Sequence, residues 1–270
     1  MTSNKTILVT GGAGFIGSHA CKALAAAGFL PVAYDDLSNG PQDHVKWGPL
    51  ETGDIRDGAA LRAVLAKNRP IAVMHFAGAI EAGLSTKDPL SFYDRNVNGT
   101  ATLAAAMQDA GVNTLVFSST AAVYGEPQTA LIAEDHPRNP INPYGRSKLM
   151  AEQLLQDTAR AHGMALTCLR YFNAAGADPD GELAERHDPE THLIPLAIAA
   201  TQAPSRSLLV FGQDYPTPDG TCVRDYVHVT DLADAHVKAL QALLDGQPGL
   251  VANLGSGQGF SVRQVLDAVE

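Results

Sequence analysis

Cysteine is scarce in this 270-residue sequence, and long apolar runs are missing. The three cysteines, Cys21, Cys168 and Cys222, lie far apart without CxxC spacing, which argues against a disulfide framework or a cysteine-bound zinc. Apolar runs such as residues 193–200 are far too short to cross a bilayer. The first residues do not resemble a secretory signal. We therefore expect a cytoplasmic protein.

Cationic side chains are also in the minority. Lysine and arginine total 19 against 29 for aspartate and glutamate, and the formal net charge is −10. A surface of this kind repels phosphate backbones and anionic lipids, so nucleic-acid and membrane partners are not expected, although a local site for a small phosphate is compatible with it. With 45% apolar and 18% charged residues, the chain has the composition of a globular protein.

Strand-like and helix-like segments alternate along most of the chain. The strand-like segments are short continuous apolar runs, which is typical of buried parallel strands. We expect strands over residues 6–10, 31–35, 71–76, 114–118 and 165–171, and helices over 18–28, 59–67, 98–110 and 144–162. The alternation predicts an α/β fold with a doubly wound parallel sheet of the Rossmann type.

A glycine-rich turn follows the first expected strand. Gly11 and Gly14 would allow a tight turn and a close approach of the backbone to a pyrophosphate, and Gly17 would let the next helix pack closely on the strand. The helix N-terminus then faces the phosphates with free N–H groups. Asp35, at the end of the next expected strand, can accept hydrogen bonds from ribose hydroxyls and would repel a 2′-phosphate. This context predicts a dinucleotide site that favours NAD over NADP.

Tyr144 and Lys148 lie four residues apart near the start of a long expected helix. Asn142 is a natural N-cap and Pro143 suits the first helical position. The spacing places the phenol and the ammonium on one helix face, where the ammonium would lower the pKa of the phenol and make it a usable base. Thr120, at the end of the preceding strand, could hydrogen-bond a reacting hydroxyl.

Together these residues resemble the extended short-chain dehydrogenase/reductase family, and within it the UDP-glucose 4-epimerases (UDP-galactose 4-epimerases). The resemblance extends from residue 6 to about residue 268. Its motifs are TGGAGFIGSH at 10–19, GDIR at 53–56, HFAG at 75–78, NVNGT at 96–100, FSSTAAVYG at 117–125, YGRSK at 144–148, LRYFN at 169–173 and VRDYVHVTDLAD at 223–234.

The resemblance implies NAD as the cofactor and a UDP-sugar as the substrate. It implies Tyr144 as the base, Lys148 as its partner and Thr120 as the hydroxyl beside the sugar. Beyond the glycines and Asp35, it assigns cofactor contacts to Phe15, Ile16, Asp36, Leu37, Asn39, Asp54, Ile55, Phe76, Ala77, Gly78, Asn96, Ser118, Tyr144, Lys148, Tyr171 and Phe172. With Thr120 and Tyr144, it assigns the substrate site to Asn173, His192, Leu193, Phe211 and Arg224.

The implied reaction is the interconversion of UDP-glucose and UDP-galactose in galactose metabolism, by transient oxidation at sugar carbon 4. Tyr144 takes the proton of the 4-hydroxyl while the hydride passes to tightly bound NAD, and the hydride then returns to the other face of the sugar. The resemblance also implies a homodimer.

Alternative functions within and beyond this family stay open. A 4,6-dehydratase needs an Asp-Glu pair after the threonine, where this chain has Ala121 and Ala122. A 4-epimerase of a UDP-pentose, UDP-uronate or UDP-N-acetylhexosamine is harder to separate, because the sugar substituents leave little trace in the sequence. A non-catalytic NAD-binding protein would be expected to lose Tyr144 or Lys148, and both are present.

We expect residues 1–172 to form the NAD-binding Rossmann domain and residues 173–270 a smaller nucleotide-sugar-binding lobe, which returns to the sheet over about residues 226–254. Residues 173–225 are rich in Pro, Gly and Asp and predict loops and short elements, and the glycine cluster at 255–259 predicts a turn. Because the chain ends at Glu270 within a helix opened by Ser261, we expect this lobe to be C-terminally incomplete.

Four potential metal ligands cluster in the second lobe: His187, Asp188, Glu190 and His192. They lie in a proline-containing segment without the HExxH spacing that places two histidines on one helix face. A solvated loop or a substrate-lobe role fits them better, and no metal site is expected.

Overall fold

The structure is a computed structural model that describes residues 5–203 and 207–270. The strands are β1 (Thr6–Thr10), β2 (Leu30–Asp35), β3 (Leu50–Thr52), β4 (Ala72–His75), β5 (Thr114–Thr120), β6 (Ala165–Tyr171), β7 (Asn173–Ala175), β8 (Val223–His228), β9 (Val251–Leu254) and β10 (Gly259–Ser261). The α-helices are α1 (Phe15–Ala26), α2 (Gly58–Asn68), α3 (Ala82–Ser85), α4 (Pro89–Tyr93), α5 (Gly99–Asp109), α6 (Pro143–His162), α7 (Leu193–Gln202), α8 (Val229–Leu244) and α9 (Val262–Val269).

Seven strands form one parallel sheet in the order β3-β2-β1-β4-β5-β6-β9. The expected Rossmann-type sheet is therefore confirmed. Its central strands are buried along their whole length, which is why they appear in the sequence as continuous apolar runs. Because every pair is parallel, the carboxyl ends of the strands meet at one edge, and the loops that leave them lie together there.

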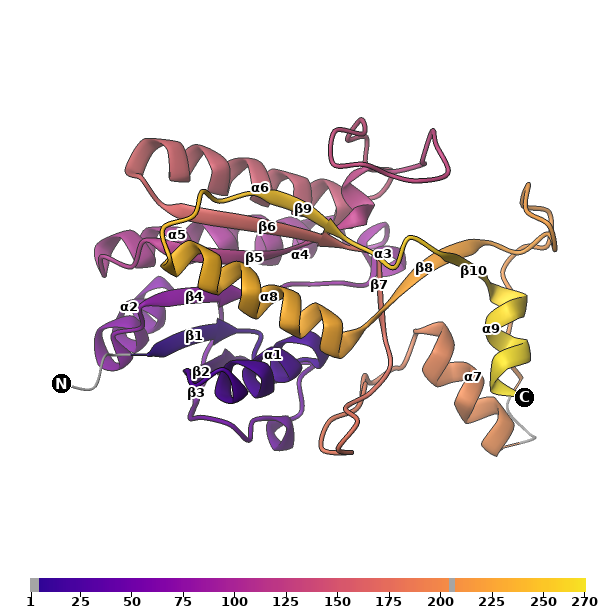
Figure 1. Ribbon diagram of the computed structural model, residues 1–270, viewed down its shortest axis with the longest axis horizontal. Helices are drawn as coiled ribbons and strands as arrows, with labels where there is room; N and C mark the ends of the chain where they lie inside the picture. Colours follow the sequence, from indigo (N-terminus) through magenta and orange to yellow (C-terminus); the bar gives the residue numbers. More distant parts are fainter. Residues whose placement is uncertain (1–4, 204–206) are drawn as a thin grey trace.

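Helices cover both faces of this sheet (Figure 1). On one face α2, α5 and α6 pack side by side, and on the other face α1 packs against α8. Each layer closes its own apolar core: Leu61, Leu103 and Leu155 belong to the first, Leu24 and Leu240 to the second. Two cores on opposite faces hold the sheet rigid and thus fix the edge from which the site is built.

Several helix ends follow directly from the sequence. The side chain of Asn142 accepts a hydrogen bond from the Gly145 amide at 2.8 Å, and Pro143 occupies the first turn of α6, as predicted. Gly163 ends that helix at φ +68°. The expected start of the first helix at residue 18 was wrong, since α1 begins at Phe15. Gly17 already lies inside the helix, which packs directly on the glycine turn.

The second lobe contains more regular structure than expected. Residues 173–225 include the ten-residue helix α7, and β7 and β8 join β10 in a three-stranded sheet. β7 and β8 pair over a long gap in the sequence, with Asn173 opposite Tyr226, which no local pattern reveals. Ser261 caps α9 in a capping box with Gln264, as its position predicted. Figure 1 shows α7 and α9 beside one another at one end of the molecule.

The chain returns to the main sheet after this lobe. Helix α8 leads back along α1, and β9 pairs with β6, with Leu254 opposite Tyr171. Among the described helices, none combines the length and the apolar character that a bilayer crossing requires.

Candidate active site

The glycine turn between β1 and α1 has no room for side chains. Gly11 has φ +74°, and a Cβ there would lie 2.6 Å from the backbone nitrogen of Ala77. A Cβ on Gly17 would lie 2.0 Å from the carbonyl oxygen of Gly11. No side chain caps α1 at Gly14, and its first turn, with Phe15 buried and Ile16 partly exposed, holds no acidic residue. The helix therefore presents a bare, positively polarised N-terminus at the carboxyl edge of the sheet.

An aspartate lies beside this turn at the end of β2. Asp35 is 8% exposed, and its carboxylate accepts hydrogen bonds from the amides of Ala13 at 3.0 Å and Leu37 at 2.9 Å. Burial raises the pKa of Asp35, and the two hydrogen bonds act against that rise. The carboxylate thus orders both the glycine turn and the segment after β2, in which Asp36 and Asn39 are exposed.

The next two predicted cofactor residues, Asp54 and Ile55, follow β3. The carboxylate of Asp54 accepts hydrogen bonds from Arg56 at 2.9 and 3.1 Å, which lowers its pKa to about 2. The Asp54 carbonyl accepts a hydrogen bond from the phenol of Tyr34 at 2.8 Å. Ile55 is buried beneath Gly99. Ile55 and the Asp54 backbone therefore give this side of the site its shape, because the Asp54 carboxylate already has a cationic partner.

The loop after β4 carries Phe76, Ala77 and Gly78, and a buried amide holds it in place. Asn96 Oδ1 accepts from the Ala79 amide at 2.8 Å, and its Nδ2 donates to the Ala79 carbonyl at 3.0 Å and to Ser147 Oγ at 2.9 Å. A Cβ on Gly78 would lie 2.7 Å from Asn96 Oδ1. Because every amide atom of Asn96 is engaged, it connects this loop to α6 rather than offering free contacts.

Tyr144 and Thr120 come together where β5 ends and α6 begins. The Tyr144 phenol is half-buried, and burial raises its pKa, while a hydrogen bond with the Thr120 hydroxyl lowers it. We expected the Lys148 ammonium to lower the pKa of the Tyr144 phenol. The pKa is raised instead, so the expected direction was wrong. Desolvation by burial is the larger of the two effects.

Lys148 lies on the same face of α6 but points toward the sheet. Its ammonium is 4.4 Å from the centre of the Phe117 ring and 7% of the residue is exposed. Burial lowers the pKa of Lys148 to about 8, although the Glu152 carboxylate opposes this shift. A lysine with this pKa is charged at neutral pH and still able to release a proton near pH 8.

Ser118 and Tyr171 form a second hydroxyl pair on neighbouring strands. Their oxygens are 2.7 Å apart, and burial raises the pKa of Tyr171 far above its usual range. The charge of a Tyr144 phenolate would raise it further, so Tyr171 stays protonated beside the predicted base. The ring of Phe172 lies against Gly255, where a Cβ would be 3.0 Å away. All these groups lie at the carboxyl edge, as the predicted site requires.

The predicted substrate residues of the second lobe are spread over separate elements. Asn173 on β7 donates to the Asp225 carbonyl at 2.9 Å, and Arg224 on the adjacent strand β8 is exposed. His192 and Leu193 stand at the start of α7. Phe211 is 83% exposed, so the structure does not bring it into a packed site.

Two organising residues were missed at the level of sequence. Ser147 holds Asn96 from α6, and Asp225 accepts from the amides of Ser256 at 2.9 Å and Gly257 at 3.0 Å. The predicted turn at residues 255–259 is confirmed for residues 255–258, whereas Gly259 begins β10, and Asp225 connects the turn to β8. Both residues stand inside quoted motifs, YGRSK and VRDYVHVTDLAD, and that position was the available signal.

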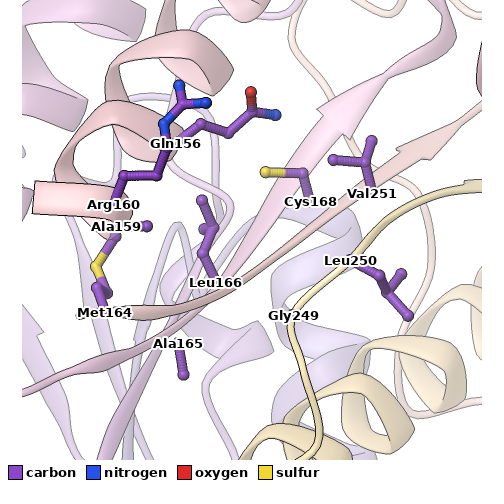
Figure 2. A pocket seen from close by; sticks show the side chains of 10 residues that line it. All are labelled: Gln156, Ala159, Arg160, Met164, Ala165, Leu166, Cys168, Gly249, Leu250 and Val251. Carbon is purple, nitrogen blue, oxygen red and sulfur yellow. The ribbon is translucent and has the colours of Figure 1, made fainter.

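A surface hollow of about 400 Å³ lies elsewhere, between the end of α6 and the starts of β6 and β9 (Figure 2). It is lined by the apolar Met164, Leu166 and Leu250 and by Arg160. This hollow is at the amino edge of the sheet, opposite to Tyr144 and Thr120, and it contains no pair of groups suited to acid–base chemistry.

Comparisons with known proteins agree with this geometry. Residues 7–255 match the NAD dependent epimerase/dehydratase family. A UDP-glucose 4-epimerase of Rhizobium meliloti is 55% identical over 267 residues, which cover 99% of this chain and 81% of that protein. The structure of UDP-glucose 4-epimerase from Brucella ovis in complex with NAD superposes with a TM-score of 0.95 at 51% identity, covering 98% of this chain and 81% of that one.

A further solved structure extends the comparison to a nucleotide. The UDP-glucose 4-epimerase from Bifidobacterium longum in complex with NAD+ and UDP has a TM-score of 0.90 at 39% identity, covering 97% of this chain and 82% of that chain. The match spans the glycine turn, the Tyr144–Lys148 helix and β8. On its sequence, its fold and these relatives, the chain belongs to the NAD dependent epimerase/dehydratase family.

Proposed function

We propose that this chain interconverts UDP-glucose and UDP-galactose by transient oxidation at sugar carbon 4, with NAD bound tightly throughout the cycle. The observation that carries the proposal is the position of Tyr144 in the first turn of α6, which packs against β5 and against the short turn that Thr120 caps. It lies at the same edge of the sheet as the bare N-terminus of α1, and Lys148 follows on the same face of α6.

The residues around the glycine turn fit a dinucleotide. The uncapped N-terminus of α1 suits a pyrophosphate, and the space beside Gly14 is open, since a Cβ there would meet only the Gly11 carbonyl, at 3.3 Å. Asp35 uses two acceptor positions for backbone amides and keeps others for ribose hydroxyls. NAD, when bound here, supplies the hydride acceptor and donor that chemistry at carbon 4 requires.

The hydroxyl groups of the site indicate which residue transfers the proton. In this proposal the Tyr144 oxygen accepts the proton of the sugar 4-hydroxyl and later returns it. Because burial raises the pKa of Tyr144, the phenolate needs support from the Thr120 hydroxyl and from the Lys148 charge. Tyr171 keeps its own proton in the hydrogen-bonded pair with Ser118 and so cannot replace Tyr144.

We assign the division of labour as residues 1–172 for the cofactor and residues 173–270 for the UDP-sugar, with the return to the sheet over residues 226–254. Asn173, His192, Leu193, Phe211 and Arg224 then contact the substrate. The exposed guanidinium of Arg224 suits the UDP diphosphate, because arginine matches phosphate oxygens in charge and geometry.

The alternatives differ mainly in the sugar. A UDP-pentose, a UDP-uronate or a UDP-N-acetylhexosamine would use the same oxidation at carbon 4. A 4,6-dehydratase is disfavoured, because Thr120 caps a short turn, Ala121–Val123, in which no carboxylate follows it. A purely NAD-binding role is disfavoured by the presence of both Tyr144 and Lys148.

We also propose that the protein is cytoplasmic and acts as a homodimer. Leu90 on α4 is 79% exposed and Met150 on α6 is 46% exposed, and these two helices pack against one another. They place two exposed apolar side chains on neighbouring helices of the layer that includes α6. Light scattering that gives the mass of a single 28.3 kDa chain at micromolar concentration would contradict the dimer.

The test of the function is turnover of UDP-galactose by the purified protein together with the NAD released on denaturation. We expect bound NAD and formation of UDP-glucose, and we expect Tyr144→Phe to lower turnover by about 10²-fold or more while the protein stays folded and keeps its NAD. Tyr215→Phe, which changes an exposed tyrosine, serves as the matched control.

Three results would decide against the proposal. A Tyr144→Phe variant with nearly normal turnover would remove the assigned base. Protein that neither carries NAD nor binds added NAD would favour a different cofactor. Turnover of UDP-pentoses or UDP-uronates in place of UDP-galactose would keep the mechanism but change the substrate.

A further inference from the structure

Four polar side chains converge in the segment between β7 and α7. They are Glu185, His187, Glu190 and His192, all partly buried, and one ligand atom from each lies within 4.8 Å of every other. The sequence suggested Asp188 as a member of this group, but the structure replaces it with Glu185. The set therefore consists of two imidazoles and two carboxylates.

The distances between these atoms range from that of a hydrogen bond, between His192 Nδ1 and Glu190, to those of neighbouring ligands in a coordination shell. His192 Nδ1 lies 3.0 Å from Glu185 and 2.8 Å from Glu190, and His187 Nδ1 lies 3.5 Å from Glu185 and 3.6 Å from Glu190. Tetrahedral zinc with nitrogen and oxygen ligands at about 2.0–2.2 Å separates neighbouring ligands by about 3.3 Å. The two imidazole rings are 4.8 Å apart and tilted by 48°, so they converge without stacking.

One nitrogen atom of this group is buried without a hydrogen bond from the described residues. His187 Nδ1 is buried and has no hydrogen-bond partner in the part of the chain that the structure describes, because neither nearby carboxylate meets it with hydrogen-bond geometry. A buried imidazole nitrogen of this kind carries a desolvation cost unless something occupies its lone pair. The Glu185 side chain, with 8% exposure, has its ion-pair partners in the same two histidines.

A second cluster in the chain has its carboxylates paired with a cation of the protein itself. Asp178, Asp180 and Glu182 also lie close together, but the ammonium of Lys22 sits among them at 2.7, 2.7 and 2.8 Å. A lysine therefore already fills the place of a cation there. The histidine–glutamate cluster has imidazoles, which bind zinc-like ions well, in place of the lysine.

We propose that Glu185, His187, Glu190 and His192 bind one divalent transition-metal ion of the zinc class. The ligands are Nδ1 of each histidine and one oxygen of each glutamate. Since four protein ligands complete a tetrahedron, the site is structural rather than catalytic. The ion fixes the segment that leads into α7, whose N-cap is His192. The inference does not depend on the proposed epimerase activity, and it leaves Nε2 of His192 for the substrate contact proposed above.

The test is metal binding by the full chain after treatment with a chelator and dialysis. We expect titration with Co²⁺ to produce the visible absorption of tetrahedral cobalt, to saturate at one equivalent, and to be reversed by Zn²⁺. His187→Ala and Glu185→Gln should each weaken binding by about 10²-fold or more, since each removes a ligand outright. Zinc should raise the melting temperature of the wild-type chain but not of these variants.

Two control variants separate this site from other groups. Asp180→Asn alters the lysine-centred cluster, and His162→Ala removes an exposed histidine at the end of α6, so both should bind Co²⁺ like the wild type. Circular dichroism confirms that each variant is folded, and Glu185→Gln covers the case in which His187→Ala is not.

The proposal is overturned by either of two results. In one, the wild-type chain gives no saturable cobalt absorption and no zinc-dependent rise in melting temperature, and the cluster is then a network of ion pairs. In the other, one metal binds but survives both substitutions, and the ion then belongs elsewhere in the chain.

Discussion

The two halves of the molecule bury their helices to very different extents. In the sheet domain, α1 buries the side of the helix that includes Ala20, Cys21 and Leu24, and α5 does the same with Leu103 and Met107. In the second lobe, α7 has the sequence LIPLAIAATQ and yet buries only Ala197, and α9 has no buried residue.

Exposed apolar side chains occur in both halves. Leu90 and Leu131 of the sheet domain are 79% and 72% exposed, and Leu209 and Phe211 of the second lobe are 70% and 83% exposed. The contrast therefore lies in the packing of the helices, since α7 and α9 contribute almost nothing to a core. The glycine turn, Asp35, Tyr144 and Thr120 stand instead on elements fixed by two packed cores. The residues proposed for the cofactor and for catalysis, whose positions must be fixed within small tolerances, therefore lie in the well-packed sheet domain. The residues proposed to surround the UDP-sugar lie mainly in the less tightly packed second lobe.

The largest expected difference concerns stability. Leu103→Ala removes a fully buried side chain from the core over the sheet and should lower the free energy of unfolding by about 2–5 kcal/mol. Ile198→Ala removes a side chain of similar size on α7 that is 43% exposed, and should cost about 0.5 kcal/mol or less. Urea denaturation of both variants measures the two values. Equal losses would show that α7 is packed as tightly as α5.

A second substitution probes the close fit of the glycine turn. Gly17→Ala places a methyl group where the Gly11 carbonyl lies, at 2.0 Å, so the turn must shift and NAD affinity should fall by about 10²-fold. Gly83→Ala is the matched control, because a Cβ there meets nothing within 4 Å. Calorimetric titration with NAD gives both affinities, and an unchanged Gly17→Ala affinity would mean that the turn is not the pyrophosphate site.

The contrast between the two halves also explains which structural features could be predicted from the sequence. The sheet, the glycine turn and the ends of α6 depend on local signals: β-branched runs, glycines at fixed spacing, and the pair Asn142 and Pro143 before a long helix. Those features were predicted with small errors at the ends, such as the late start assigned to α1.

Other features depend on contacts between distant residues. The pairing of β7 with β8 brings Asn173 opposite Tyr226, and the amide of Asn96 reaches Ser147, and neither has a local signature. The direction of the Tyr144 pKa shift depends on burial, which spacing along a helix does not reveal. Glu185 was missed because its closeness to His187 and His192 depends on the fold of the segment before α7, which has no regular spacing.

A third prediction concerns the second lobe alone. Arg224→Ala should raise the KM for the UDP-sugar about tenfold, since a charge-assisted hydrogen bond to phosphate contributes about 1.5–3 kcal/mol and exposure reduces that value. NAD binding should not change, because Arg224 lies on β8 and not at the glycine turn. Arg224→Lys should recover part of the loss by restoring the charge. Steady-state kinetics with UDP-galactose measures the change in KM. A lower NAD affinity of the Arg224→Ala variant would show that the UDP-sugar site and the cofactor site are not separate.

The smallest expected effect is on stability near the base. Burial lowers the pKa of Lys148 to about 8 from its ordinary 10.5, so its charge destabilises the folded protein. Below pH 8 the lysine is charged in both states and the full penalty applies. Between pH 8 and 10.5 the folded protein binds fewer protons than the unfolded chain, so this residue's contribution to stability improves as the pH rises. Lys148→Met, which removes the charge, should therefore melt at a higher temperature than the wild type at pH 7, by a few degrees.

That advantage should shrink as the pH approaches 10, because the wild-type lysine is then neutral when folded. The same variant should lose turnover, since the phenolate of Tyr144 loses its cationic support. Lys238→Met, on the exposed side of α8, is the matched control and should show no pH-dependent difference. Thermal unfolding of the three proteins across this pH range decides the point. A Lys148→Met variant that is less stable than the wild type at pH 7 would contradict this prediction. It would mean that the contact with the Phe117 ring and the attraction of Glu152 outweigh the desolvation of the ammonium, so that the charge of Lys148 stabilises the folded protein.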